Sequence, residues 1–109
     1  MFYIDSTDDH IYITKGDSAV IDVTLYKNDE EYTMQPGDKL YFAMKRNNDF
    51  NYTIWSSEVE VPEIDIATAT SNSWAFGEYD YSITLIYSNG NKDTFITGKL
   101  TVLGVSYGD

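Results

Sequence analysis

The chain has 109 residues, which is enough for one domain with its own hydrophobic core. It has no cysteine, and this excludes disulfide bonds and thiolate metal ligands. Eighteen acidic against seven basic residues give a formal net charge of −11, a field that disfavours partnership with nucleic acid or an anionic membrane surface. No apolar run reaches the roughly 20 residues of a membrane span, and no signal peptide is recognisable at the N-terminus.

The sequence predicts a single β-sandwich domain over residues 1–109, with residues 1–10 as a fraying, flexible N-terminus that can donate a short edge strand. Short segments then alternate apolar and polar side chains, the period of a half-buried strand. Turn signals separate them: Gly16 beside Asp17, a polar turn at 28–31, and Pro36-Gly37-Asp38. The strands expected in this half cover residues 11–14, 19–25, 40–45 and 51–57.

Residues 63–76 are harder to interpret. Apolar Ile64 and Ile66 alternate with acidic residues and favour a strand that continues to Thr68. A single helical turn over 67–73 is the alternative. We expect Trp74 to belong to the core, because it lies two residues before Phe76 at strand spacing.

The chain is organised around a hairpin over residues 77–102. Tyr81, Ile83 and Leu85 alternate with polar residues, so these three should face the core and Thr84 the opposite side. Asn89-Gly90 is a hairpin turn signal, since both residues tolerate positive φ. On the return strand, Ile96, Leu100 and Val102 share one face. Gly98 interrupts that face and indicates either a bulge or a close backbone approach.

About seven or eight short strands with turns between them predict an all-β, immunoglobulin-like antiparallel β-sandwich. The segment Gly77-Glu78-Tyr79-Asp80-Tyr81 resembles the entry to the penultimate strand of such sandwiches. There, a tyrosine hydroxyl hydrogen-bonds back across a corner while its ring is buried. Either Tyr79 or Tyr81 could form this structural corner. The period of two does not distinguish them, because both lie on the same face of the strand.

Several motifs together carry a wider resemblance, which covers roughly residues 11–103. These motifs are Thr14-Lys15-Gly16-Asp17-Ser18, Pro36-Gly37-Asp38 before Leu-Tyr-Phe-Ala-Met-Lys, Gly77-Glu78-Tyr79-Asp80-Tyr81, Ser88-Asn89-Gly90 and Gly98-Lys99-Leu100-Thr101-Val102. They resemble the immunoglobulin-like N-terminal domains of baseplate upper proteins and related tail or fibre proteins of phages that infect Gram-positive bacteria. The resemblance implies a non-enzymatic structural protein of a phage or prophage virion, made in the bacterial cytoplasm, that contacts other virion proteins or itself.

The residues offer few candidates for chemistry. His10 is the one histidine, and no positioned nucleophile accompanies it, so a catalytic triad is not expected. We expect no cofactor. Calcium is the alternative, with oxygen ligands from Asp5, Asp8 and Asp9, or from Asp17 with Asp38. No Asp-x-Asp-x-Asp-Gly spacing supports such a site, and acidic loops are usually just solvated.

A second functional hypothesis is a bacterial cell-surface carbohydrate-binding or adhesion module that uses exposed aromatics. Trp55, in a polar and loop-rich region, is the residue we single out for stacking on a sugar ring. Exposed sheet edges are templates for pairing, so a homo-oligomer is also an expectation.

Overall fold

The computed structural model of the chain describes residues 2–5, 7–46 and 53–104. These residues form ten strands and one short helix, and the expectation of an all-β sandwich is confirmed. The elements of the first half are β1 (Phe2–Asp5), β2 (His10–Thr14), β3 (Ala19–Asp22), β4 (Tyr26–Lys27), β5 (Glu30–Glu31), β6 (Lys39–Arg46) and β7 (Thr53–Val59). Those of the second half are β8 (Glu63–Ile66), α1 (Thr68–Asn72), β9 (Gly77–Ile86) and β10 (Lys92–Leu103).

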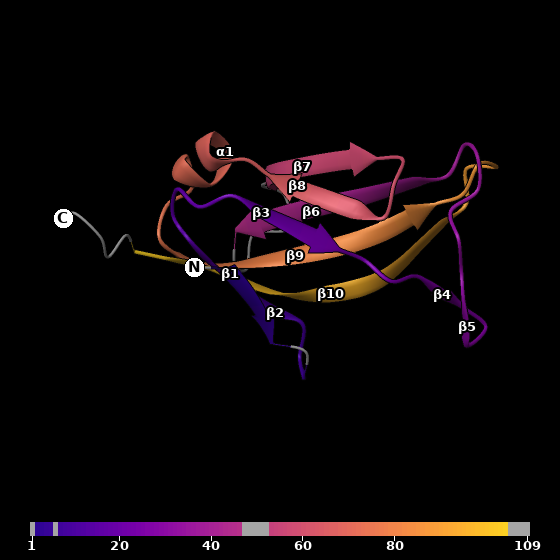
Figure 1. The fold of residues 1–109 in the computed structure, drawn as a ribbon, viewed down its shortest axis with the longest axis horizontal. Helices are drawn as coiled ribbons and strands as arrows, with labels where there is room; N and C mark the ends of the chain where they lie inside the picture. Colours follow the sequence, from indigo (N-terminus) through magenta and orange to yellow (C-terminus); the bar gives the residue numbers. More distant parts are fainter. Residues whose placement is uncertain (1, 6, 47–52, 105–109) are drawn as a thin grey trace.

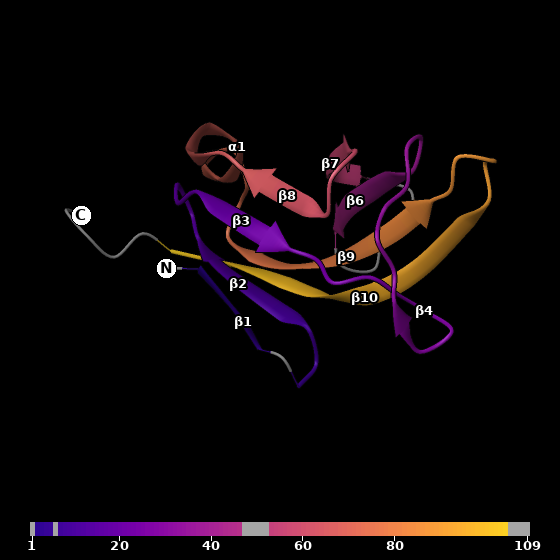
Figure 2. The ribbon, with the colours of Figure 1, turned by 45° about the vertical axis from the view of Figure 1, so that its right-hand side comes forward.

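The sandwich has two unequal layers (Figures 1 and 2). A six-stranded sheet runs in the order β1-β2-β10-β9-β6-β7, and the short pair β3-β8 lies over one of its faces. The order β10-β9-β6-β7 opposite β3-β8 corresponds to strands G-F-C-C′ and B-E of a variable-type immunoglobulin sandwich. The pairing is antiparallel throughout, except that β2 runs parallel to β10.

The core lies between these layers, and β9 contributes the side chains of one of its faces to it. Tyr81, Ile83 and Leu85 are buried, whereas Thr84 lies on the outer face and bonds to Thr94. The register expected from the period of two is therefore confirmed. Trp74 is also buried, at 3% exposure. The remaining large apolar side chains of the core come from β2, β3, β6, β8, β9 and β10, and from Val23 and Leu25, which follow β3. The apolar side chains of β7 are only partly buried against this core.

Residues 63–76 combine the two structures considered from the sequence. The strand ends at Ile66, and α1 begins at Thr68, so the expected continuation of the strand to Thr68 is wrong. The buried Ser71 provides a physical reason. Its hydroxyl accepts from the Gly16 N–H (3.1 Å) and donates to the Asp17 carbonyl (2.7 Å). The helical turn thus satisfies backbone groups of the β2–β3 turn that would otherwise be buried without partners.

Two turns differ in detail from the expectation. Asn28 and Asp29 both have positive φ, 53° and 66°, which makes a tight two-residue hairpin between β4 and β5. In the β9–β10 turn only Gly90 has positive φ, 91°, and its N–H donates to the Tyr87 carbonyl. The Tyr87 N–H also donates to the Asn91 carbonyl, so this pair closes a three-residue loop of Ser88, Asn89 and Gly90, one residue longer than a two-residue Asn-Gly turn.

Gly98 is a close approach and not a bulge. A Cβ at this position would lie 2.9 Å from the Asp9 carbonyl oxygen and 3.1 Å from the Tyr81 ring. The irregularity of β10 occurs instead between Thr94 and Ile96, where the register with β9 shifts by one residue.

Candidate ligand-binding face

Both candidate corner tyrosines donate hydrogen bonds from their hydroxyls, but to different places. Tyr79 reaches the carbonyl of Ala75, four residues upstream and 2.6 Å away, which is the geometry of a tyrosine corner. Tyr81 reaches the carbonyl of Asp9 in the β1–β2 turn, at 2.5 Å. Burial, helped by the charges of Asp9 and Asp8, raises the pKa of Tyr81 to about 12. Tyr79 closes a local corner, whereas Tyr81 connects distant strands.

Asp5, Asp8 and Asp9 shape the turn between β1 and β2. Asp5 accepts from the N–H and hydroxyl of Thr7, and these bonds lower the pKa of its carboxyl. Asp8 accepts from the N–H of His10 at 3.1 Å. Over the ranges that the structure describes, no three acidic or histidine side chains gather as ligands for one metal ion. The structure thus uses two of these carboxylates as local turn caps.

Asp17 and Asp38 lie at opposite ends of the sandwich, in the turns before β3 and before β6 (Figure 1). Asp38 is 3% exposed and accepts three hydrogen bonds, from the Tyr32 hydroxyl and from the N–H groups of Gln35 and Ser88. These bonds, led by Tyr32, lower the pKa of Asp38. Asp38 therefore organises the turns at its end of the fold.

Trp55 packs on the core side of β7 and does not stand as a free platform. It is half-buried, and its ring centroid lies 5.6 Å from that of Phe42 and 5.7 Å from that of Trp74. Its large surface is thus used mainly for packing. The stacking of Trp55 on a sugar ring therefore stays a prediction.

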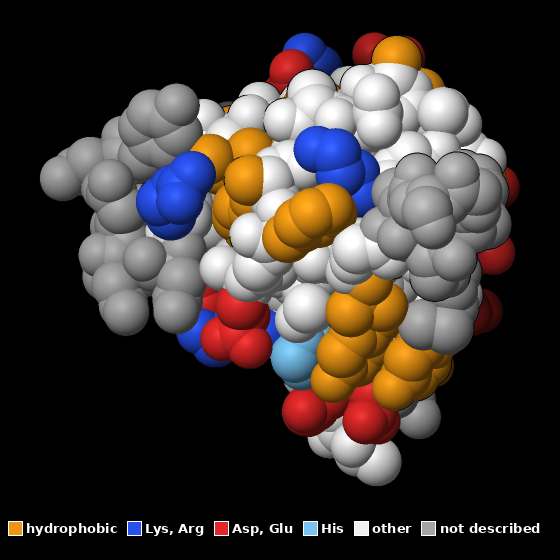
Figure 3. Space-filling model, turned by 90° about the vertical axis from the view of Figure 1, so that its left-hand side faces the viewer, with side chains coloured by type: hydrophobic (Ala, Val, Ile, Leu, Met, Phe, Trp, Pro, Cys, Tyr) orange, Lys and Arg blue, Asp and Glu red, His pale blue; other side chains and the backbone are white. Residues whose placement is uncertain are grey.

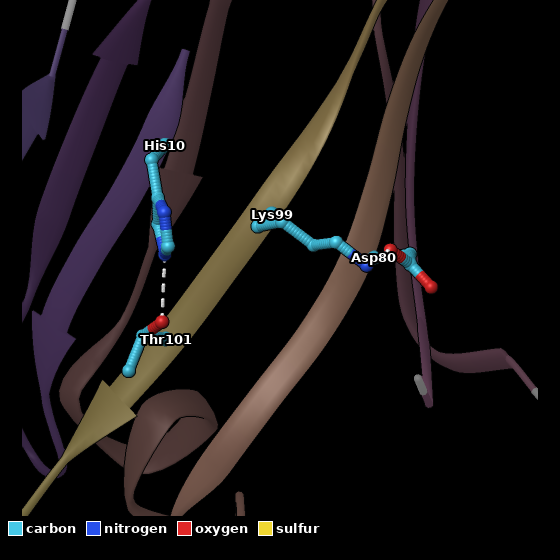
Figure 4. Close-up of polar contacts among 4 residues, drawn as sticks. All are labelled: His10, Asp80, Lys99 and Thr101. Carbon is cyan, nitrogen blue, oxygen red and sulfur yellow. Dashed lines mark hydrogen bonds and ion pairs between the residues drawn. The ribbon is translucent and has the colours of Figure 1, made fainter. Parts of the chain in front are cut away.

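The outer face of the six-stranded sheet carries instead an aromatic ladder of Tyr3, Tyr12 and His10. The Tyr12 ring stacks between the other two, with centroids 4.8 Å from Tyr3 and 4.2 Å from His10 and interplanar angles of 8° and 10°. Figure 3 shows the chain's single histidine (pale blue) against hydrophobic side chains, with acidic side chains next to it. His10 Nε2 lies 2.7 Å from the hydroxyl of Thr101 on β10 (Figure 4).

Sequence reasoning missed this ladder. Its one available signal was the spacing of His10 and Tyr12, which puts both on one face of a strand. The place of Tyr3 depends on the pairing of β1 with β2, because Tyr3 lies directly opposite Tyr12 in that register.

Beside the ladder, the same face has a hollow of about 440 Å³. Its lining comes from three neighbouring strands: Ala43 and Lys45 of β6, Asp80, Tyr81 and Ser82 of β9, and Thr97, Gly98 and Lys99 of β10. Lys99 Nζ lies 2.6 Å from Asp80 Oδ1, and Figure 4 shows the lysine extending from β10 towards β9. This hydrogen bond, with the nearby charge of Glu78, raises the pKa of Lys99.

The face therefore combines stacked rings with converging donors and acceptors, an arrangement suited to binding. No helix in the described ranges is long and apolar enough to cross a membrane. Comparison with models of protein families, with curated proteins and with solved structures finds no match to this chain.

Proposed function

We propose that the chain is a structural protein of a phage or prophage virion, associated with the baseplate, tail or fibre, and that it acts through protein–protein contacts without catalysing a reaction. The resemblance over residues 11–103 supports this, since its motifs fall on turns and strands of the sandwich. Four of its glycines have positive φ between 90° and 135°. These glycines are Gly16, Gly37, Gly77 and Gly90.

The observation that carries the proposal is the edge strand β1, in which three apolar side chains precede its single charged residue, Asp5. Among the residues that the structure describes, it pairs with β2 alone, and it offers Phe2, Tyr3 and Ile4 in an unbroken register. Tyr3 is 48% and Ile4 37% exposed. Proteins usually protect such edges with charges, proline or bulges, because a free edge is a template for another strand.

The other edges of the fold carry more of these protective features. The opposite edge of the large sheet, β7, has Glu58 and a register shift against β6. The small sheet bears outward acidic side chains, Asp22 on β3 and Glu63 and Asp65 on β8. We infer that β1 is the edge kept open for a partner, which adds a strand to the sheet.

Charge favours a different protein as that partner. Two copies of a chain with net charge −11 repel each other, whereas a neutral or basic strand from another virion protein does not. Pairing between two copies is the alternative outcome and would appear as a dimer.

The test is incorporation into particles made by the bacterium that carries the gene. After prophage induction, the chain should be found by mass spectrometry in gradient-purified virions. Tyr3→Lys should reduce its incorporation at least about tenfold, because a charge on the open edge opposes strand addition. Tyr26→Lys is the matched control, since Tyr26 is 64% exposed on the distant β4. Absence of the wild-type chain from particles would reject the proposal.

The carbohydrate-binding module remains the second candidate. The outer-face hollow and ladder favour it, in place of Trp55.

A further inference from the structure

The hollow exists because one transverse row of the sheet is built from small residues. Ala43, Ser82 and Thr97 stand side by side on β6, β9 and β10, with Ser82 in register with both others. In the next row, Lys45, Asp80 and Lys99 are in register in the same way. The long side chains of the second row therefore border one side of the hollow, and the small residues of the first row form its base.

The chemistry of this site is mixed. Asp80 accepts hydrogen bonds, the two ammonium groups donate them, and the hydroxyls of Ser82 and Thr97 can do both. Such a set suits a ligand with many hydroxyls, because each hydroxyl needs a donor and an acceptor when water is displaced. The volume of about 440 Å³ is sufficient for one pyranose ring with room for water.

The two lysines of the hollow differ in their surroundings. Two lysines flank one aspartate, and Lys99 is held by Asp80 at 2.6 Å. Within the part of the chain that the structure covers, Lys45 has no carboxylate at ion-pair distance. An ammonium group directed over a concave surface without a partner is a natural anchor for a carboxylate.

We propose that this hollow binds an acidic sugar, a pyranose whose carboxylate pairs with Lys45 and whose hydroxyls bond to Asp80, Ser82 and Thr97. The inference goes beyond the proposed virion function and uses a different part of the surface from the β1 edge. The chain's overall negative charge does not prevent it, since fields are screened beyond about 8 Å at physiological salt, while Lys45 lies in the site.

The competing interpretation is a cross-strand charge row that only keeps the face soluble. A solubility row does not need the adjacent row of small residues, which leaves the ammonium groups beside a hollow. The two interpretations differ in what they predict for a small acidic sugar.

The test is a titration of the full chain, labelled with ¹⁵N, with glucuronic acid and separately with glucose at equal ionic strength. We expect glucuronic acid to bind with a Kd of about 1 mM. Its binding should change the amide chemical shifts of Ala43, Ser82, Thr97 and Lys99. Glucose should bind about fivefold to tenfold more weakly, because it lacks the carboxylate.

Two variants and a control complete the experiment. Lys45→Gln should remove the preference for glucuronic acid, and Ser82→Leu, which fills the hollow, should abolish binding of both sugars. Lys39→Gln, a neutralisation at the other end of the same strand, should change neither. The amide spectrum of each variant reports whether it is folded.

No shift changes at saturating sugar, changes confined to another surface, or equal binding of glucuronic acid by wild type and folded Lys45→Gln would each overturn the proposal. None of these outcomes touches the virion function, which rests on Tyr3 and particle incorporation.

Discussion

The hydroxyl of Tyr79 donates a 2.6 Å hydrogen bond to the carbonyl oxygen of Ala75, and so ties the start of β9 to the segment that follows α1. The ring of Tyr79 is buried, while its hydroxyl is satisfied by the backbone. One side chain thereby fixes the angle at which the chain enters the central strand of the fold.

Tyr79→Phe should lower the free energy of unfolding by about 1 kcal/mol, because it removes one hydrogen bond and keeps the ring. Urea denaturation followed by circular dichroism measures the loss. Tyr41→Phe is the control, since Tyr41 lies on the outer face of β6 and no hydrogen bond of its side chain is found among the described residues. Equal urea midpoints of unfolding for Tyr79→Phe and wild type would contradict a stabilising role for the hydrogen bond of Tyr79.

Leu85 and Thr84 test the register of β9. Leu85→Ala should cost about 2–5 kcal/mol, because Leu85 is buried and its truncation leaves a cavity. Thr84→Ala should cost less than about 1 kcal/mol, since it loses only an exposed bond to Thr94. Denaturant unfolding of the two variants measures the contrast, and a costlier Thr84→Ala would reverse the assignment of faces.

Gly98 should not tolerate a side chain. Gly98→Ala places a methyl group 2.9 Å from the Asp9 carbonyl oxygen, which accepts the Tyr81 hydroxyl bond. We expect a loss of about 1–3 kcal/mol from this overpacking, measured by thermal unfolding. In the control Gly104→Ala, the new methyl group lies 4.0 Å from the nearest ring atoms of Phe76 and should be accepted. If both variants melt alike, the close approach is not a constraint.

The bond between Tyr32 and Asp38 predicts a dependence of stability on pH. The folded state lowers the pKa of Asp38, so its contribution is complete above the ordinary value of 3.8 and is lost as the pH falls through the lowered pKa. The same bond raises the pKa of Tyr32 from 10.0 to about 12. Its contribution is therefore complete below pH 10.0 and is lost as the pH rises towards 12.

Asp38→Asn should accordingly melt below wild type at about pH 7. The difference between the two melting temperatures should be smaller at about pH 3, because below the ordinary pKa of 3.8 the unfolded state takes up a proton at Asp38 more readily than the folded state. Thermal unfolding at both pH values measures this. Asp93→Asn, at an exposed position on β10, is the control, and its melting temperature should differ little from that of wild type at either pH. If the melting temperature of Asp38→Asn lies equally far below that of wild type at both pH values, the charge of Asp38 is not what stabilises the turn.

Local pattern was sufficient to predict most of β2, β6 and β9 and the faces of β9, because successive side chains of a strand point to opposite sides. Turn residues predicted most breaks between strands for a similar reason, since Gly90 and Gly37 adopt backbone conformations that other residues avoid. Pattern was insufficient at 63–76, where the buried bonds of Ser71 decide in favour of a helical turn.

The amino-acid sequence by itself determined an all-β sandwich, a buried Trp74 and the core face of β9, all of which follow from short-range spacing. Tertiary structure alone decided which tyrosine closes the corner, because Tyr79 and Tyr81 share a face and differ only in the carbonyl within reach. Tertiary structure also decided which side chains meet on the outer face of the large sheet. There, β2 lies beside β10, and this pairing brings His10 to Thr101, which is 91 residues away in the sequence. No local period encodes such a contact, which forms only when distant strands take a common register.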